Sequence, residues 1–296
     1  MEYASGTVHD YYCLMKPRVM SLVIFTSFVG LILSPVSIHP FLGLTSLICI
    51  AIGAGAAGVL NMWYDADIDR LMKRTVKRPI PSGNISKSEA FTYGTVMAFG
   101  SVFVMGVLIN WYSAAFLAFT IFFYVFIYTI WLKRRTIQNI VIGGAAGAFP
   151  PVIGWMSTSA SVTLEPILLF FIIFLWTPPH FWALAILTSS EYEKVNIPMM
   201  PNVMGNKSTI NQILIYSVVM SLVAISPYFI GMVTFVYLIP VSILSISFIF
   251  IAVQLYKSKE DTKTRKYSKR LFIYSIFYLF MVFLIFLLDY AFVNFF

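Results

Sequence analysis

Three side chains that can bind a metal recur every four residues near the end of an apolar segment. They are Asn61, Asp65 and Asp69, in the stretch NMWYDADIDR. If one helix continues through them, they line a single helical face over about 12 Å. Like charges at this spacing repel each other, so a shared cation would stabilise them. One or two carboxylates, completed by substrate phosphates and water, are typical of a Mg²⁺ site.

Basic side chains follow the acidic ones closely and recur in a second cluster. They are Arg70, Lys73, Arg74, Lys77 and Arg78, and then Lys133, Arg134 and Arg135. Arginine and lysine bind phosphate through charge-assisted hydrogen bonds, so both clusters are candidates for binding a phosphorylated substrate. Two simpler interpretations stay open: a solvated loop of mixed charge, and a basic anchor at the membrane surface.

The rest of the chain predicts how these residues are positioned. The sequence has 59% hydrophobic and 11% charged residues, too few charges to cover a soluble protein of 296 residues. We therefore expect an all-α, polytopic membrane bundle, because helices satisfy their own backbone in lipid and the apolar segments exceed the roughly 10 residues of a barrel strand. The nine predicted spans are 19–37, 41–63, 91–110, 112–132, 139–157, 164–187, 211–231, 233–256 and 271–293.

The basic residues predict the orientation of these spans. All 20 Lys and Arg residues fall in the N-terminal tail and in the loops after the second, fourth, sixth and eighth spans. By the positive-inside rule, the N-terminus is cytoplasmic and the C-terminus outside. The net charge of +8 therefore needs no nucleic-acid partner. Since the first 18 residues show no secretory signal, we expect a multi-pass protein of a bacterial plasma (inner) membrane, with its active site towards the cytoplasm.

We expect one membrane-embedded domain over residues 1–296. Acidic clusters follow the second and sixth predicted spans, and basic clusters follow the fourth and eighth. This pattern predicts two four-helix units, about 19–132 and 139–256, with a ninth helix over 271–293.

Several sequence blocks resemble one family. The spacing of Asn61, Asp65 and Asp69 resembles the first acidic motif of the UbiA superfamily of intramembrane prenyltransferases. Further blocks resemble the heme O synthases within it, in the right order and over about residues 15–205. These blocks are Arg74-Thr75-x-x-Arg78-Pro79, residues 128–140, residues 143–155, residues 176–182 and residues 197–201.

The resemblance implies the substrates farnesyl diphosphate and heme B, with heme B a substrate and not a cofactor, and Mg²⁺ as cofactor. Asn61, Asp65 and Asp69 would be catalytic, with Mg²⁺ on the two aspartates. The lipid bilayer surrounds such an enzyme, and a heme A synthase or a terminal oxidase would be a partner. The residues that would bind the diphosphate are Arg74, Arg78, Lys133, Arg134 and Lys194.

The second acidic cluster departs from the family pattern. Heme O synthases typically have Asp-Asp-Tyr after the sixth span, whereas this chain has Ser190-Glu191-Tyr192. Glu191 therefore becomes the candidate second metal ligand, and Glu193 offers another carboxylate. The alternative is a solvated loop whose charges only mark the topology.

His180 and Trp176 are the candidate heme-binding residues that the resemblance implies. We expect Pro178 and Pro179 to break or kink the helix just before the histidine, because proline lacks the backbone donor of a helical hydrogen bond. His180 could bind a heme propionate or lie near the iron. A packed histidine without a substrate role stays open.

Three other functions stay open. A prenyltransferase acting on a quinone precursor would share the acidic motif but should lack the block over residues 176–182. A membrane transporter predicts ionisable residues near the membrane centre, and this sequence has almost none. A non-catalytic oxidase assembly factor would not need the acidic spacing.

Overall fold

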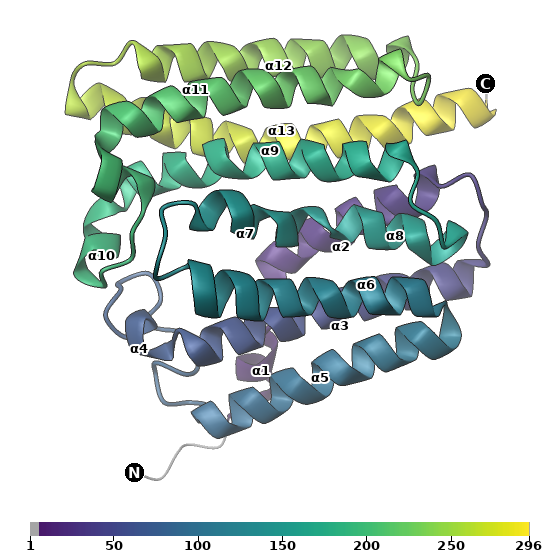
Figure 1. The fold of residues 1–296 in the computed structure, drawn as a ribbon, viewed down its shortest axis with the longest axis horizontal. Helices are drawn as coiled ribbons and strands as arrows, with labels where there is room; N and C mark the ends of the chain where they lie inside the picture. The colour runs from purple at the N-terminus through teal and green to yellow at the C-terminus, as the bar shows by residue number, and fades with distance from the viewer. Residues whose placement is uncertain (1–5, 296) are drawn as a thin grey trace. The chain divides into compact units, whose positions relative to one another are not determined.

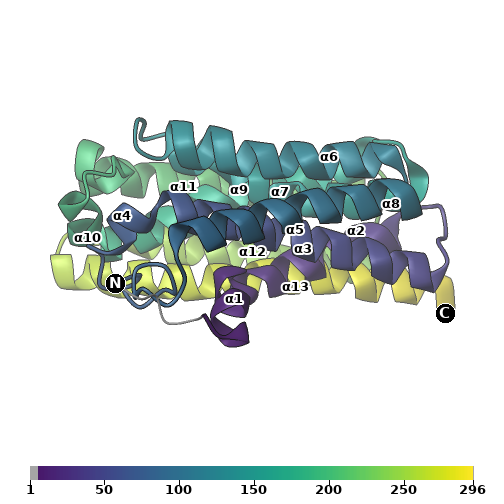
Figure 2. The same cartoon turned by 90° about the horizontal axis from the view of Figure 1, so that it is seen from below.

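The expectation of an all-α membrane bundle is confirmed. A computed structural model describes residues 6–295, with side chains through residue 294, and these residues contain helices and no strand. In this part of the chain, eight helices are long and apolar enough to cross a membrane. A ninth span results if α1 (Val8–Leu14) and α2 (Pro17–Leu33), which meet at a bend of 56°, are counted together (Figure 2).

The chain forms two compact units, and each is assembled from separate stretches (Figure 1). Unit 1 contains residues 1–135, 149–161 and 193–197, and unit 2 contains residues 136–148, 162–192 and 198–296. The units therefore do not follow chain order. The internal repetition between residues 19–132 and 139–256 stays a prediction.

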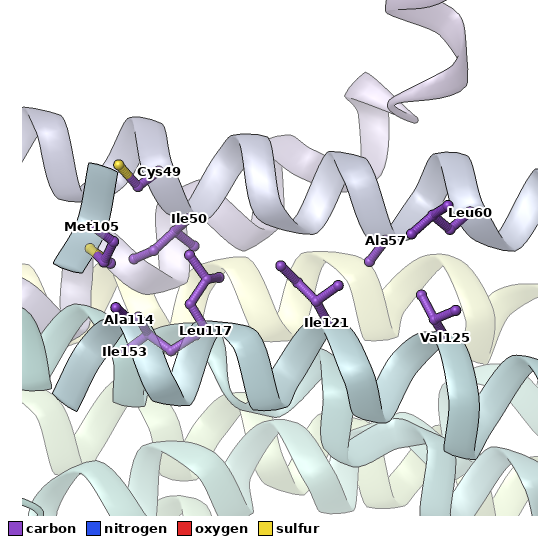
Figure 3. Close-up of a cluster of buried hydrophobic side chains, with 10 residues drawn as sticks. All are labelled: Cys49, Ile50, Ala57, Leu60, Met105, Ala114, Leu117, Ile121, Val125 and Ile153. Carbon is purple, nitrogen blue, oxygen red and sulfur yellow. The ribbon is translucent and has the colours of Figure 1, made fainter. Parts of the chain in front are cut away.

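Unit 1 contains α1, α2 and six further helical elements. They are α3 (Pro40–Tyr64), α4 (Ala66–Asp69), α5 (Lys87–Leu108), α6 (Trp111–Phe122), the π-helix η1 (Phe123–Leu132) and α8 (Pro150–Ser159). The helix α3 packs against α5, and α2 packs against α8. A buried cluster from α3, α5, α6, η1 and α8 includes Ile50, Leu117 and Ile153 (Figure 3). It packs α3, the helix that leads into the acidic motif, against the other helices of the unit.

Two glycines allow α2 and α8 to approach closely. A Cβ atom at Gly30 would lie 2.0 Å from the carbonyl oxygen of Pro151, and one at Gly154 would lie 2.1 Å from that of Ser27. Both distances are far below van der Waals contact with backbone atoms. Small residues at such crossings let transmembrane helices pack by direct backbone contact.

Unit 2 is built around α9 (Leu164–Leu187), which packs against three other helices. These are α7 (Asn139–Ala148), α11 (Met200–Phe229) and α13 (Asp261–Phe295), while α12 (Phe235–Tyr256) packs against α11 and α13. The buried carboxylate of Asp289 in α13 accepts hydrogen bonds from the backbone amides of Thr234 and Tyr237, at 3.0 and 3.2 Å. This acidic residue therefore caps the N-terminus of α12, where an anion is favourable.

The structure differs from the predicted spans at three helices. The sequence predicted a break or kink at Pro178 and Pro179. The break is wrong, because α9 runs through both prolines, and the kink stays a prediction. Contacts with α7, α11 and α13 support α9, and neighbouring helices allow proline within a membrane helix. The helix α13 begins earlier than predicted, at Asp261, because its first turns are polar and escaped a search based on apolar length. The helix α11 begins at Met200, but its backbone is non-helical at Gly205, with a φ of 78° and a ψ of 165°, so two helical stretches meet at a kink there.

Candidate active site

The acidic motif lies where α3 ends in unit 1. Asp65 is the C-cap of α3, and α4 begins at the next residue. The amide of Asp65 still donates to the carbonyl of Asn61 at 2.9 Å, and that of Asp69 donates to Asp65 at 2.9 Å. The helical path therefore continues across the cap, and Asn61, Asp65 and Asp69 follow one another by one turn each. All three side chains are buried.

Each buried aspartate pairs with a basic residue from a different segment. Lys133, directly after η1, donates to Oδ2 of Asp65. Arg78, in the loop after α4, donates to Oδ2 of Asp69 at 2.6 Å. Buried carboxylates are stable as anions only when they are paired and hydrogen-bonded, so these cations maintain the charge of the motif.

The side-chain amide of Asn61 connects three other residues. Its Nδ2 donates to Oδ2 of Asp65 at 2.8 Å and to Oγ1 of Thr129 at 3.1 Å. Its Oδ1 accepts from Nζ of Lys16 at 2.6 Å. An amide with a cation on its oxygen and acceptors on its nitrogen has a single favourable orientation. Asn61 therefore positions the carboxylate of Asp65.

The π-helix η1 carries two members of this network. The hydroxyl of Thr129 donates to the carbonyl of Tyr124 at 2.8 Å, and the amide of Lys133 donates to that of Tyr128 at 2.9 Å. Both bonds span five residues, which is the π-helical spacing, and π-helical turns are rare and are frequently found at functional sites. The π-helical backbone therefore sets how Thr129 and Lys133 face α3.

Asp67 lies outside the buried row. Its side chain is 54% exposed, and it accepts two hydrogen bonds from Arg134, at 2.7 and 2.8 Å. These bonds hold the pKa of Asp67 below its usual value and raise the pKa of Arg134. Arg134 also lies 3.6 Å from Oδ1 of Asp65 and 4.9 Å from the ring of Tyr64. Arg134 therefore closes the solvent side of the motif.

The donor set of this motif fits a Mg²⁺ ion. Oδ1 of Asp65 is buried and accepts no hydrogen bond in the described structure, although its other oxygen is fully engaged. A hard oxygen ligand with a free lone pair is what Mg²⁺ requires. Among residues 6–295, no group of three or more His, Cys, Asp or Glu residues is arranged to hold a metal ion by itself. A site with one or two carboxylates, completed by phosphates and water, does not need such a cluster.

The other predicted polar residues lie in loops and in α10 (Ser189–Lys194). Arg74 is exposed in the loop after α4, and Lys194 and Glu193 are exposed at the end of α10. Glu191 is half-buried, and its Oε2 is buried without a hydrogen-bond partner in the part of the chain described here. It therefore offers a second buried carboxylate oxygen that accepts no hydrogen bond there.

The two predicted heme-binding residues lie together in unit 2. The rings of Trp176 and His180 stack with centroids 4.3 Å apart, and Phe272 stacks on His180 at 4.7 Å. The carbonyl oxygen of Ser275 accepts a hydrogen bond from Nε1 of Trp176 at 2.7 Å. The Oγ atom of Ser275 lies 2.6 Å from Nδ1 of His180. The helices α9 and α13 therefore build one buried aromatic cluster.

Five residues of these clusters were not among the predicted site residues. They are Lys16, Tyr124, Thr129, Phe272 and Ser275. In the sequence, Lys16 served only to predict the membrane orientation. A lysine directly before Pro17 at a membrane boundary could have indicated a bend that directs its side chain towards the acidic motif. Phe272 and Ser275 carried no signal, because nothing in their spacing distinguishes them from other apolar and small residues of a span.

Comparison with known proteins identifies the family of this chain. The model of the UbiA prenyltransferase family matches residues 23–291. Protoheme IX farnesyltransferase of Bartonella bacilliformis is 55% identical over 98% of this chain and 93% of its own. The enzyme of that name from Rickettsia bellii is 54% identical over 94% and 92%.

Solved structures share the fold. A structure described as digeranylgeranylglyceryl phosphate synthase superimposes with a TM-score of 0.77 at 20% identity, over 94% of this chain and 97% of that one. A UbiA homologue from Archaeoglobus fulgidus, bound to GPP and Mg²⁺, has a TM-score of 0.65 at 18% identity, over 94% and 99%. The family match, the near-full-length relatives and the shared fold lead to one conclusion: this chain belongs to the UbiA prenyltransferase family.

Proposed function

We propose that this protein transfers the farnesyl group of farnesyl diphosphate to a vinyl group of heme B. The observation that carries the proposal is the similarity, near 55% identity over almost the whole chain, to relatives named protoheme IX farnesyltransferase. The bond between the farnesyl carbon and the diphosphate oxygen breaks, and its electron pair leaves with diphosphate. The vinyl electron pair forms the new carbon–carbon bond. Water then adds to the resulting cation and loses a proton, giving hydroxyethylfarnesyl heme.

The buried acidic motif supports binding of a diphosphate. Asp65 and Asp69 would bind Mg²⁺, which supplies positive charge to the departing diphosphate when it is bound. In the structure, Lys133 and Arg78 neutralise the same two carboxylates. Both cations can turn to phosphate oxygens when the aspartates bind a metal. The site therefore has positive charge available where negative charge grows during bond breaking.

Three further basic residues extend this role. Arg134 lies at the solvent side of the motif, within 3.6 Å of Asp65. Arg74 is exposed in the loop after α4 and Lys194 at the end of α10, and both are proposed to bind the outer phosphate. Glu191, whose buried Oε2 accepts no hydrogen bond from the described residues, is the proposed ligand of a second Mg²⁺.

The aromatic cluster of unit 2 supports binding of a porphyrin. His180 and Trp176 lie in a buried aromatic cluster, the kind of surrounding that packs against an aromatic macrocycle. Heme B would be a substrate bound at this cluster. Water must be excluded until the carbon–carbon bond has formed, and the buried position of both side chains serves this purpose.

The basic loops support a location in a bacterial inner membrane with the diphosphate site on the cytoplasmic side. All 20 Lys and Arg residues fall in the loops of one predicted face. The product would pass to a heme A synthase or a terminal oxidase in the same membrane. Reporter fusions at Lys77 and Lys263 should read cytoplasmic, and a fusion at Phe296 should read external. A reporter at Lys77 that reads external reverses the orientation.

Mass spectrometry of hemes tests the reaction directly. Purified protein is incubated with heme B, farnesyl diphosphate and Mg²⁺, and the extracted hemes are analysed. The expected product carries one farnesyl group and one hydroxyl. If heme B stays unchanged and a quinone precursor is prenylated in a parallel reaction, heme B is not the substrate. The protein would then be a prenyltransferase that acts on a quinone precursor.

A further inference from the structure

The imidazole ring of His180 is covered on both faces. Trp176 stacks on one face with an interplanar angle of 17°, and Phe272 stacks on the other with an angle of 24°. Phe181 contacts the ring edge-on at 5.0 Å. The residue is 8% exposed. With both faces covered, a further ligand of this imidazole has to approach in the plane of the ring.

The position of one proton follows from two distances at Ser275. Its Oγ lies 2.6 Å from the carbonyl oxygen of Phe272 and 2.6 Å from Nδ1 of His180. Two oxygens at 2.6 Å require a hydrogen bond between them, and a carbonyl oxygen has no proton to give. The single hydroxyl proton therefore points to Phe272. The contact with His180 is then a hydrogen bond that Nδ1–H donates to the serine oxygen.

This assignment leaves the other ring nitrogen with a lone pair. A neutral imidazole carries one proton, so a proton on Nδ1 makes Nε2 an acceptor. Among the described residues, none hydrogen-bonds to Nε2. Such a nitrogen cannot donate to a propionate, but it can donate its electron pair to a metal. Of the two heme roles considered for His180, the geometry therefore favours the one at the iron.

We infer that Nε2 of His180 is the axial ligand of the iron in the heme substrate, an inference that rests on the proposed function. The nitrogen lone pair forms the bond to iron, and no proton is displaced. Ser275 is a positioning residue, because the bond from Nδ1–H to its oxygen orients the ring and increases the basicity of the ligand. Trp176 and Phe272 prevent the ring from rotating out of this orientation.

The other two histidines of the sequence provide a matched control. His9 contacts Sγ of Cys13 at 3.4 Å, and His39 accepts a hydrogen bond from the amide of Phe41 at 3.3 Å as the N-cap of α3. A double variant, His9→Ala with His39→Asn, keeps a capping side chain at the second position. It leaves His180 as the single histidine of the chain.

Resonance Raman spectra of the full-length protein with ferrous heme B test the inference. Wild type and the double control variant should show the same iron–histidine stretching band. His180→Phe, which preserves the aromatic stack, should lose the band. His180→Ala should lose it too and regain an iron–imidazole band when imidazole is added. Ser275→Ala should retain the band at a lower frequency, because the ligand nitrogen becomes less basic.

Specific outcomes overturn the inference. An unchanged band in His180→Phe excludes His180 as the ligand, and an unchanged frequency in Ser275→Ala removes the positioning role of that serine. If His180→Phe does not fold, His180→Ala with and without imidazole decides the question. Asp65→Asn separates this inference from the proposed function, since it should form no product and still show the wild-type band. If His180→Phe forms product at the wild-type rate and binds heme with the wild-type affinity, the proposed farnesyl transfer stands and the bond from His180 to iron is contradicted.

Discussion

The charged cluster of unit 1 and the aromatic cluster of unit 2 use different interactions. In the first, two buried aspartates are neutralised by Lys133 and Arg78 from other segments. In the second, a neutral histidine is fixed by ring stacking and by one serine hydroxyl. Ion pairs can exchange partners when a charged ligand arrives, whereas a stacked ring has one packed position. The first cluster is therefore suited to a ligand whose charge changes during the reaction, and the second to holding a ligand in one fixed orientation.

The contrast also explains why one cluster is easy to detect in the sequence. Only 11% of the residues are charged, so a regular row of acidic side chains at a membrane boundary stands out. Aromatic residues make up 17% of the chain, including 28 phenylalanines, so no single one is conspicuous. Substitutions in one cluster at a time test whether the charged cluster acts on the diphosphate and the aromatic cluster on the heme.

The largest effect is expected at the buried aspartates. Asp65→Asn and Asp69→Asn should each reduce kcat for product formation at least about 100-fold, because charge stabilisation of the leaving group is lost. Asp67→Asn is the matched control two residues from each, and its exposed pair with Arg134 should contribute little. Initial rates at equal amounts of membrane-inserted protein measure the difference. Near-normal rates in Asp65→Asn or Asp69→Asn would contradict the metal–diphosphate role.

A smaller effect is expected where the π-helix contacts the acidic motif. Thr129→Val removes the acceptor for Asn61 and should reduce kcat about 10-fold, since an unsatisfied buried amide costs about 1–3 kcal/mol. Thr129→Ser retains the hydroxyl and should recover most of the activity. Heme affinity should stay at the wild-type value in both variants. Equal losses in the serine and valine variants would mean that packing, and not the hydrogen bond, is what matters at this position.

Substitutions in the aromatic cluster should change heme binding and leave the kinetics for farnesyl diphosphate unchanged. Phe272→Leu removes one stacked ring and should weaken heme binding about 3- to 10-fold, in line with about 0.5–1.5 kcal/mol for an aromatic pair. The KM for farnesyl diphosphate and the Mg²⁺ requirement should not change. Titration of heme B by absorbance, beside steady-state kinetics, gives both quantities. A raised KM for farnesyl diphosphate in this variant would show that the two clusters are not separate.

The smallest effects are expected in α10. Glu191→Gln should raise the Mg²⁺ concentration for half-maximal activity by about 2- to 5-fold, because one oxygen ligand of a partly hydrated ion is lost. Lys194→Ala should raise the KM for farnesyl diphosphate without moving the Mg²⁺ dependence. Ser190→Asp should be neutral or slightly activating, since it restores an acidic pair. An unchanged Mg²⁺ dependence with full activity in Glu191→Gln would leave Asp65 and Asp69 as the proposed ligands.

The sequence predicted the membrane bundle well, because long apolar segments in a chain of low charge have few alternatives. It also predicted the acidic row, since a spacing of four residues survives the short interruption at the C-cap Asp65. It missed η1, because a π-helix and an α-helix are equally apolar and differ only in hydrogen-bond register. It missed the link from Lys16 to Asn61, which depends on a positive φ of 54° at the bend before α2.

The interleaving of the two units has a consequence for biosynthesis. Unit 1 needs residues 149–161 and 193–197 in addition to residues 1–135, so it cannot be complete when its first helices enter the bilayer. The helix α2 carries Gly30, whose close neighbour Pro151 is synthesised 121 residues later (151 − 30). During that interval the face of α2 that packs against α8 must lie against lipid or against the insertion machinery. A ribosome-bound chain that exposes only residues 1–135 should therefore remain sensitive to proteases, and protection should appear once the segment carrying Pro151 and Gly154 has been inserted.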